Sequence, residues 1–276
     1  MGRRQQDGPV AGLRPVDTGT VALVPDNDGR RGWTMLVNGV PSSHVDLDDP
    51  LRLDFEYVRW IADVIDLIDP PGGPLRVAHL GGAGCTLPRY VAATRPESRQ
   101  VVFEIDPGVI DAARDSFGLR SGRLLKLRVG DGREGLTELA DASLDVVVRD
   151  AFSGALVPRH LTTRQFLAEV ARVLGPGGIY LANLADAPPL AKARDEAATL
   201  LATFRHVVLI AEPAQFSGRR FGNVVVAGAR QRLPVEGLVR RLASAAVRAR
   251  MLATNEVRAF AAGRRPLDDE PAGLPH

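Results

Sequence analysis

Cysteine is almost missing from this chain of 276 residues, because Cys85 is the only one. A single cysteine excludes an internal disulfide framework and any zinc site built from several thiolates. The five histidines are scattered, so the sequence predicts no metal centre. No apolar run approaches the roughly 20 residues that span a bilayer, and residues 1–15 lack the apolar core of a signal peptide. We therefore expect a cytoplasmic protein without a membrane partner.

A strong charge of one sign is also missing. The chain has 35 Lys and Arg against 33 Asp and Glu, which gives a formal net charge of +2. This near balance argues against a dedicated nucleic-acid binder. The arginine-rich residues 238–252 alternate with apolar residues, which predicts a solvated amphipathic helix, with an anionic partner face as the alternative. The helix has no interleaved aromatic residues, so we expect no nucleic-acid partner.

The composition of the two ends differs from that of the middle of the chain. Residues 1–15 are rich in Gly, Arg, Gln and Pro and are predicted to be disordered. Residues 251–276 form a C-terminal tail, and its part from residue 263 onward is also predicted to be disordered. Within residues 16–50, two short apolar runs flank the turn-forming sequence Pro-Asp-Asn-Asp-Gly. This β-rich segment is therefore expected to form a small hairpin.

The middle of the chain, residues 51–250, is expected to form one nucleotide-binding catalytic domain. It starts with a helical pattern of apolar residues over 51–68, and then short apolar runs alternate with helical stretches. This alternation predicts an α/β fold with a seven-strand, mostly parallel, Rossmann-like sheet. The expected strands are 76–80, 100–105, 124–129, 144–148, 178–184, 206–211 and 223–227, with helices at 86–93, 107–117, 163–174 and 187–203.

A glycine-rich loop follows the first strand of this domain. Gly81, Gly82 and Gly84 stand between that strand and the next helix, where small residues let the backbone approach a ligand and the helix N-terminus faces it. The alternative is a tight turn. The dinucleotide fingerprint is incomplete, since Leu87 stands where its third glycine would be, and this argues against NAD.

Three acidic residues follow the next three strands. Glu104 ends the second strand, where a carboxylate can bind both ribose hydroxyls. Asp131, followed by Gly132, ends the third, where it can accept a hydrogen bond from an adenine amino group. Asp150 follows Arg149 and a run of three valines at the end of the fourth. A solvent-facing strand end, a turn and a helix cap are the respective alternatives, but three acids at one sheet edge favour a shared ligand crevice.

Four further residues near these motifs carry weaker indications. Arg149 is interpreted as a structural ion-pair partner and Cys85 as a packing residue. Asn183, at the end of the fifth strand, is interpreted as a turn cap, with a substrate contact as the alternative. His160 follows a loop that resembles a lid, and its interpretation is a surface position, again with substrate contact as the alternative.

Together these segments resemble the polyamine aminopropyltransferase (spermidine synthase) family, whose fold is that of class I S-adenosylmethionine (SAM) methyltransferases. The resemblance runs from about residue 19 to about residue 228 and is carried by residues 36–43, 81–89, 103–106, 131–132, 150 and 213–222. It implies decarboxylated SAM or SAM as co-substrate, a small amine acceptor and Asp150 as catalytic residue. A carboxylate suits the amine, which is protonated at neutral pH and has to lose a proton before it attacks the carbon beside a sulfonium.

The chain departs from the family pattern at four positions. Gly84 replaces a loop aspartate that holds the donor's amino group, and Ser153 replaces a second aspartate. Gln215 replaces a tyrosine and Ser42 a glutamine at positions that hold the donor chain and the diamine. A doubly charged diamine would bind poorly among fewer carboxylates, because buried charges need partners.

Two alternatives to aminopropyl transfer therefore stay open, a SAM-dependent methyltransferase and a nucleotide-binding protein without turnover. A homodimer is expected as well, partly from the resemblance. Its other basis is the predicted hairpin, because Trp33, Met35 and Val37 would leave apolar strand edges exposed.

Overall fold

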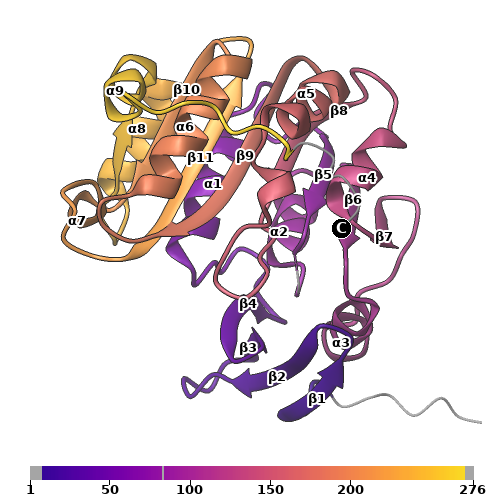
Figure 1. Cartoon of the computed structure of the whole chain (residues 1–276). Coiled ribbons are helices and arrows are strands. Elements are labelled where there is room, and N and C mark those ends of the chain that lie inside the picture. The colour runs from indigo at the N-terminus through magenta and orange to yellow at the C-terminus, as the bar shows by residue number, and fades with distance from the viewer. Residues whose placement is uncertain (1–7, 83, 271–276) are drawn as a thin grey trace, which may run out of the picture.

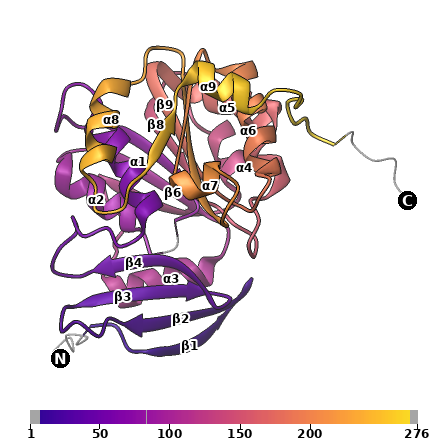
Figure 2. The same cartoon turned by 90° about the vertical axis from the view of Figure 1, so that its left-hand side faces the viewer.

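The computed structural model describes residues 8–82 and 84–270. Its N-terminal part is a four-stranded antiparallel sheet in chain order, formed by β1 (Gly12–Val16), β2 (Gly19–Pro25), β3 (Gly32–Val37) and β4 (Val40–Asp46) (Figures 1 and 2). The expected hairpin is thus half of a larger sheet. The expectation of disorder is wrong for the part of β1 within residues 1–15, of which residues 1–7 lie outside the described residues. β1 pairs with β2 through backbone groups while most of the side chains of β1 stay exposed, so no apolar pattern in the sequence predicts this strand.

The expectation of exposed apolar strand edges on this sheet is wrong. β3 lies between β2 and β4, with both of its edges paired. Met35 is completely buried, and it belongs to a core that includes Val109 and Phe117 of helix α3 (Pro107–Phe117). The homodimer stays a prediction, but these residues no longer support it.

The main sheet has eight strands in the order β12-β10-β11-β9-β8-β5-β6-β7. The five from β5 to β9 run parallel to their neighbours, and the remaining pairs are antiparallel. This confirms the α/β class and the mostly parallel sheet, with one strand more than expected. The strands are β5 (Arg76–Leu80), β6 (Arg99–Glu104), β7 (Leu125–Val129), β8 (Leu144–Arg149), β9 (Leu174–Asp186), β10 (His206–Ala211), β11 (Gly222–Ala229) and β12 (Arg250–Leu252).

Helices cover both faces of the main sheet (Figure 1). One core packs under α1 (Glu56–Asp66), α2 (Thr86–Thr94) and α8 (Val235–Ser244). The other packs under α4 (Gly132–Thr137), α5 (Arg164–Val173), α6 (Ala191–Thr203) and α9 (Thr254–Phe260). A short helix α7 (Pro213–Phe216) and a 3-10 turn η1 (Arg159–Leu161) complete the elements. None of the described helices is long and apolar enough to cross a membrane.

The C-terminal third of the chain differs from the expectation in two ways. The helix predicted over residues 238–252 is shorter, because α8 ends at Ser244 and the chain then adds β12 to the sheet edge. Residues 263–270, predicted to be disordered, lie against α5 and α6. The Leu267 N–H donates to Thr199 Oγ1 over 2.9 Å, and Asp269 pairs with Arg133 over 2.7 Å. These polar contacts fix a segment whose composition resembles a free tail; residues 271–276 lie outside the described part.

Asp106 joins the N-terminal sheet to the main domain. Its carboxylate begins α3 by accepting from Gly108 N at 2.8 Å, and it also accepts from the backbone and the hydroxyl of Thr18 at 2.7 and 2.6 Å. Burial alone would raise the pKa of Asp106, but these hydrogen bonds hold it below its usual value. The β1–β2 turn is therefore held beside the carboxyl ends of the main-sheet strands.

Candidate active site

A cavity of about 430 Å³ lies at the carboxyl ends of β5, β6 and β8, beside the N-terminal sheet. In open α/β sheets this is the edge where ligands bind. Eight of the ten residues expected at the site line the cavity, and two, Gly84 and Gln215, do not. The eight are Ser42, Gly81, Gly82, Glu104, Asp131, Gly132, Asp150 and Ser153.

Asp150 lines the cavity directly after β8. Its Oδ2 accepts a hydrogen bond from the Tyr57 hydroxyl at 3.1 Å, and its Oδ1 accepts from Asn183 Nδ2 at 3.0 Å. Burial raises the pKa of Asp150 above its ordinary value, although Asn183, Tyr57 and Arg149 all act in the opposite direction. The result is a fixed carboxylate that is more basic than an exposed aspartate.

Asn183 is itself held in place by a second amide. It lies within β9 rather than in a turn, and its Oδ1 accepts from Asn223 Nδ2 on β11 at 3.1 Å. The interpretation of Asn183 as a turn cap is wrong, because β9 continues to Asp186. Asn223, Asn183 and Asp150 thus form a chain of hydrogen bonds across three neighbouring strands.

Arg149 is buried beneath the cavity. Its guanidinium pairs with Glu196 of α6 at 2.9 Å and donates to the carbonyl oxygens of Leu161 and Asn183 at 3.2 and 3.0 Å. Both partners of the ion pair are buried, with 0% and 5% of their side chains exposed. This confirms the interpretation of Arg149 as a structural ion-pair partner. The pair also supports η1 and β9, which carry residues of the cavity.

Asp131 and His160 form the wall at the end of β7. Asp131 begins α4 by accepting from Arg133 N at 2.8 Å, and its other oxygen lies 2.7 Å from His160 Nε2. Burial would raise the pKa of Asp131, but His160 and the helix N–H groups lower it. The interpretation of His160 as a surface residue is confirmed, because its side chain is 46% exposed, but it also lines the cavity beside Asp131.

Gly81 brings the backbone of the glycine loop against the next strand. It has a φ of +80°, and a Cβ at this position would lie 2.5 Å from the Asp150 carbonyl oxygen. Only glycine combines this conformation with this approach. The loop therefore lies directly beside Asp150, as a ligand shared by the two would need.

Gly84 does not line the cavity. Its N–H donates to Ser43 Oγ at 3.0 Å, and a Cβ there would meet Ser43 at 2.9 Å and Phe117 at 3.1 Å. The N-terminal sheet and α3 thus fill the space that a side chain would take. This geometry therefore gives Gly84 no direct contact with a ligand in the cavity. The neighbouring Cys85 is a buried packing residue, and burial raises the pKa of its thiol to about 12.

Gln215 is buried inside α7, with its Oε1 accepting from Glu212 N at 3.1 Å. It closes the turn between β10 and β11 and does not line the cavity. The polar residue that β11 supplies to the cavity is instead Asn223, beside Phe221.

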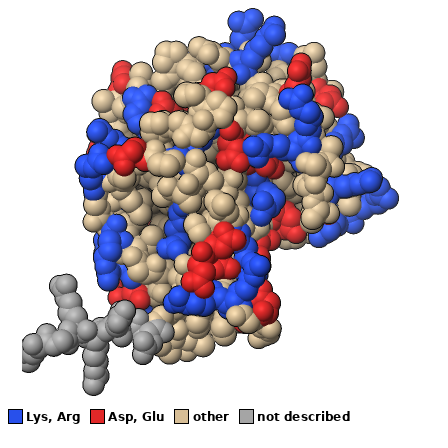
Figure 3. All heavy atoms as spheres, turned by 180° about the vertical axis from the view of Figure 1, so that it is seen from behind, with Lys and Arg blue, Asp and Glu red and all other residues tan. Residues whose placement is uncertain are grey.

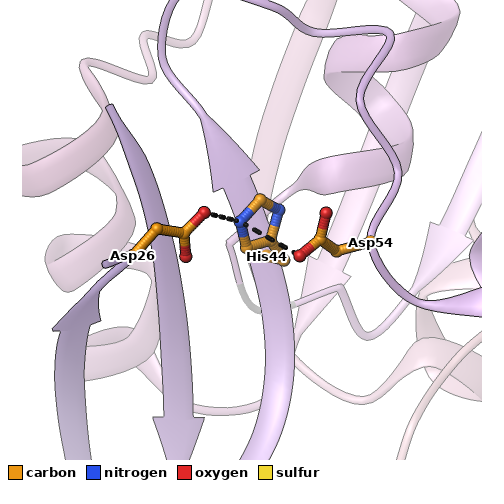
Figure 4. Close-up of side chains that lie close together, drawn as sticks. All are labelled: Asp26, His44 and Asp54. Atoms are coloured by element: carbon orange, nitrogen blue, oxygen red, sulfur yellow. Dashed lines mark hydrogen bonds and ion pairs between the residues drawn. The ribbon is translucent and has the colours of Figure 1, made fainter. Parts of the chain in front are cut away.

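Asp26, His44 and Asp54 are the one group in the described ranges with metal-ligand geometry (Figure 4). His44 Nε2 lies 2.9 Å from Asp26 and 3.7 Å from Asp54. The Arg52 guanidinium contacts the same two carboxylates at 2.9 and 3.0 Å. Because a cation already occupies the position between the acids, the cluster fits an ion-pair network rather than a metal site. None of its members lines the cavity.

Basic side chains are distributed over the face shown in Figure 3, with acidic side chains between them. This pattern agrees with the balanced composition. It gives this face no single basic surface of the kind that follows a phosphate backbone.

Residues 55–226 match the family model of the spermine/spermidine synthase domain. The chain belongs to this family. A probable spermidine synthase from Corynebacterium glutamicum has a solved structure that is 35% identical, covers 97% of this chain and 99% of its own, and superposes with a TM-score of 0.90. The polyamine aminopropyltransferase of Vibrio vulnificus is 33% identical over 134 residues, which is 48% of this chain and 44% of that protein.

Human methyltransferase-like protein 13, solved in complex with SAH, is 21% identical over 79% of this chain and 97% of its own, with a TM-score of 0.57. This likeness confirms the methyltransferase-like fold. The chain spans about half the length of the first curated relatives that it matches.

The sequence does not mark Tyr57 and Asn223 as cavity residues. Tyr57 lies within the helical apolar pattern of residues 51–68, and Asn223 lies within the expected strand 223–227. A tyrosine on a buried helix face needs a partner for its hydroxyl, and this was the available signal. The partner itself, 93 residues away, could not be read from the sequence.

Proposed function

We propose that this protein transfers the aminopropyl group of decarboxylated SAM to an amine acceptor, with Asp150 as the base. The observation that carries the proposal is the Asp150 carboxylate, held by Tyr57 and Asn183 in a cavity that also contains Glu104 and Asp131. The family membership and the aminopropyltransferase relatives support the same reaction class.

The adenosyl part of the donor is assigned to the end of the cavity at β5, β6 and β7. Gly81 and Gly82 allow close approach, and we assign Glu104 at the end of β6 to the ribose hydroxyls and Asp131 to the adenine amino group. With the adenosyl part bound in this way, we expect the carbon beside the sulfonium to face Asp150.

The charge of the cavity favours the decarboxylated donor. Apart from His160, which faces Asp131, the described lining contains no basic side chain, whereas it contains three carboxylates. The sulfonium and ammonium of decarboxylated SAM suit such a cavity. The carboxylate of SAM itself would find no cationic side chain there.

The reaction needs one proton transfer and one displacement. Asp150 binds the protonated acceptor and takes a proton from its nitrogen, which frees the lone pair. The nitrogen then forms a bond to the aminopropyl carbon as the carbon–sulfur bond breaks, and the electron pair goes to sulfur. The second N–H proton is lost to solvent or stays on the product amine, and neutral methylthioadenosine leaves without an acid. In-line positioning of the two substrates supplies the rest of the rate.

Mass spectrometry of purified protein with decarboxylated SAM and a mixture of mono-, di- and polyamines tests the proposal. We expect methylthioadenosine and an amine one aminopropyl unit heavier, and much less of both with Asp150→Asn. A parallel reaction with SAM tests methyl transfer. Methylated amine in that reaction, with no product in the first, would replace the proposal with a methyltransferase; nucleoside binding without product in both would favour a binding protein.

A further inference from the structure

We propose that the acceptor is a primary monoamine with an apolar body, rather than a diamine. The inference rests on the proposed function and concerns the half of the cavity on the far side of Asp150 from Glu104 and Asp131. From the strand order we assign to this acceptor half the lining residues that follow Asp150 in the chain and those on or next to β9 and β11, namely Phe152, Ser153, Asn183, Ala185, Phe221 and Asn223.

The acceptor half has one carboxylate, that of Asp150. The other two carboxylates among the described lining residues, Glu104 and Asp131, follow β6 and β7 on the opposite side of β5 from β8. The six other residues of the acceptor half are all uncharged. One ammonium can therefore be paired at the reacting end, and a second at the far end would lose water without gaining a charged partner.

Acidic residues next to this half are already bound elsewhere. Asp186, which follows Ala185, accepts from Ala187 N at 2.8 Å and from Ala193 N at 2.9 Å, at the start of α6. Glu212 pairs with Arg220 at 2.9 Å. Neither carboxylate lines the cavity, so neither replaces the missing partner.

The side chains that do face the acceptor half suit an apolar body. Phe152 and Phe221 line it while 38% and 59% exposed, and burying such surface under a ligand is favourable. Arg219 stands two residues before Phe221 and is exposed. Its positive charge disfavours a second ammonium at this end and leaves an uncharged tail unaffected, whereas the charge of Arg220 is paired with Glu212.

The test compares hexylamine with 1,6-diaminohexane, which have the same chain length and differ only in the second amine. With decarboxylated SAM, we expect kcat/KM for methylthioadenosine release to be at least tenfold higher with hexylamine. A preference for the diamine would overturn the inference and leave aminopropyl transfer standing. In parallel, calorimetry measures binding of both amines to the methylthioadenosine-loaded protein. If neither amine turns over, tighter hexylamine binding would keep the monoamine assignment while the proposed reaction fails, and equal or weaker binding would overturn both.

Ser153 offers a gain-of-function variant with a matched control. It is exposed in the loop after β8 and lines the acceptor half, so Ser153→Asp adds the missing carboxylate and Ser153→Asn adds the same bulk without charge. We expect Ser153→Asp to shift the hexylamine to diaminohexane ratio at least tenfold toward the diamine, and Ser153→Asn to leave it within twofold of the unmodified protein. Equal ratios in both variants would contradict the charge argument.

Discussion

Tyr57 and Asp150 lie 93 residues apart in the chain, yet the tyrosine hydroxyl donates to the aspartate carboxylate at 3.1 Å. Burial, and then the nearby Asp150 carboxylate, raise the pKa of Tyr57 well above its usual value, so the hydroxyl keeps its proton and acts as a donor. With Asn183 on the other oxygen, Asp150 has both carboxylate oxygens fixed by neutral donors. The base is thus oriented by neutral donors, while the nearby Arg149 is paired with Glu196.

The first prediction concerns Asp150→Asn. The amide oxygen can still accept from Asn183 and its NH2 can donate to the Tyr57 oxygen, so we expect folding to be retained and turnover to fall by about 10²–10⁴. Because burial raises the native pKa of Asp150 above the unfolded value, ionisation costs stability, and this cost grows as pH rises through the raised pKa.

The variant should therefore have the higher Tm at pH 7, and the difference should shrink toward pH 4, where Asp150 is increasingly protonated. Thermal unfolding of both proteins at the two pH values checks this. A lower Tm for Asp150→Asn at pH 7, or normal turnover, would show that the carboxylate is not a buried base.

The second prediction concerns Tyr57→Phe, which keeps the ring and removes the donor. Loss of a hydrogen bond to the charged form raises the pKa of Asp150 further, so the acidic limb of the kcat/KM profile should move to higher pH. A hydrogen bond to a charged group contributes about 1.5–3 kcal/mol, which corresponds to a loss of roughly 10–100-fold at low pH.

Tyr90→Phe is the matched control for this change. Tyr90 donates to Asp66 at 2.8 Å and does not line the cavity. Its pH profile should coincide with that of the unmodified protein. If both variants move the acidic limb equally, or neither does, Tyr57 does not tune the base.

Sequence reasoning worked where the pattern is local. The apolar runs of β5, β6 and β8 and the acids at their ends predicted the sheet and the cavity wall, because strand ends meet at one edge whatever the loops do. It failed for β1 and for residues 263–270, whose order depends on distant partners such as Asp106 and Arg133. It also predicted a ligand contact for Gly84 that the structure does not show. The position of a residue in a loop does not reveal that the N-terminal sheet packs against that residue.

The third prediction concerns Gly81→Ala. Gly81 has a left-handed φ of +80°, which is strained for alanine, and the added Cβ would lie 2.5 Å from the Asp150 carbonyl oxygen. The loop therefore has to move away from Asp150. We expect a cost of about 1–3 kcal/mol in stability and at least tenfold weaker binding of methylthioadenosine. Gly122→Ala is the control, since a Cβ there has open space and no left-handed φ. Unchanged nucleoside affinity in Gly81→Ala would remove the glycine loop from the donor site.

The last prediction concerns the buried pair of Arg149 and Glu196. Removing the carboxylate with Glu196→Ala leaves a fully buried guanidinium with only backbone carbonyls, and we expect a loss of about 3–5 kcal/mol in the free energy of unfolding. The pair of half-buried Arg172 and exposed Asp141 is the comparison, and Asp141→Ala should cost about 0–1 kcal/mol. Urea unfolding of both variants measures the difference. Since Arg149 also donates to the Asn183 carbonyl oxygen, Glu196→Ala should lower kcat more than Asp141→Ala does. Equal effects of the two variants on stability and on kcat would show that the pair of Arg149 and Glu196 neither stabilises the core nor positions Asn183.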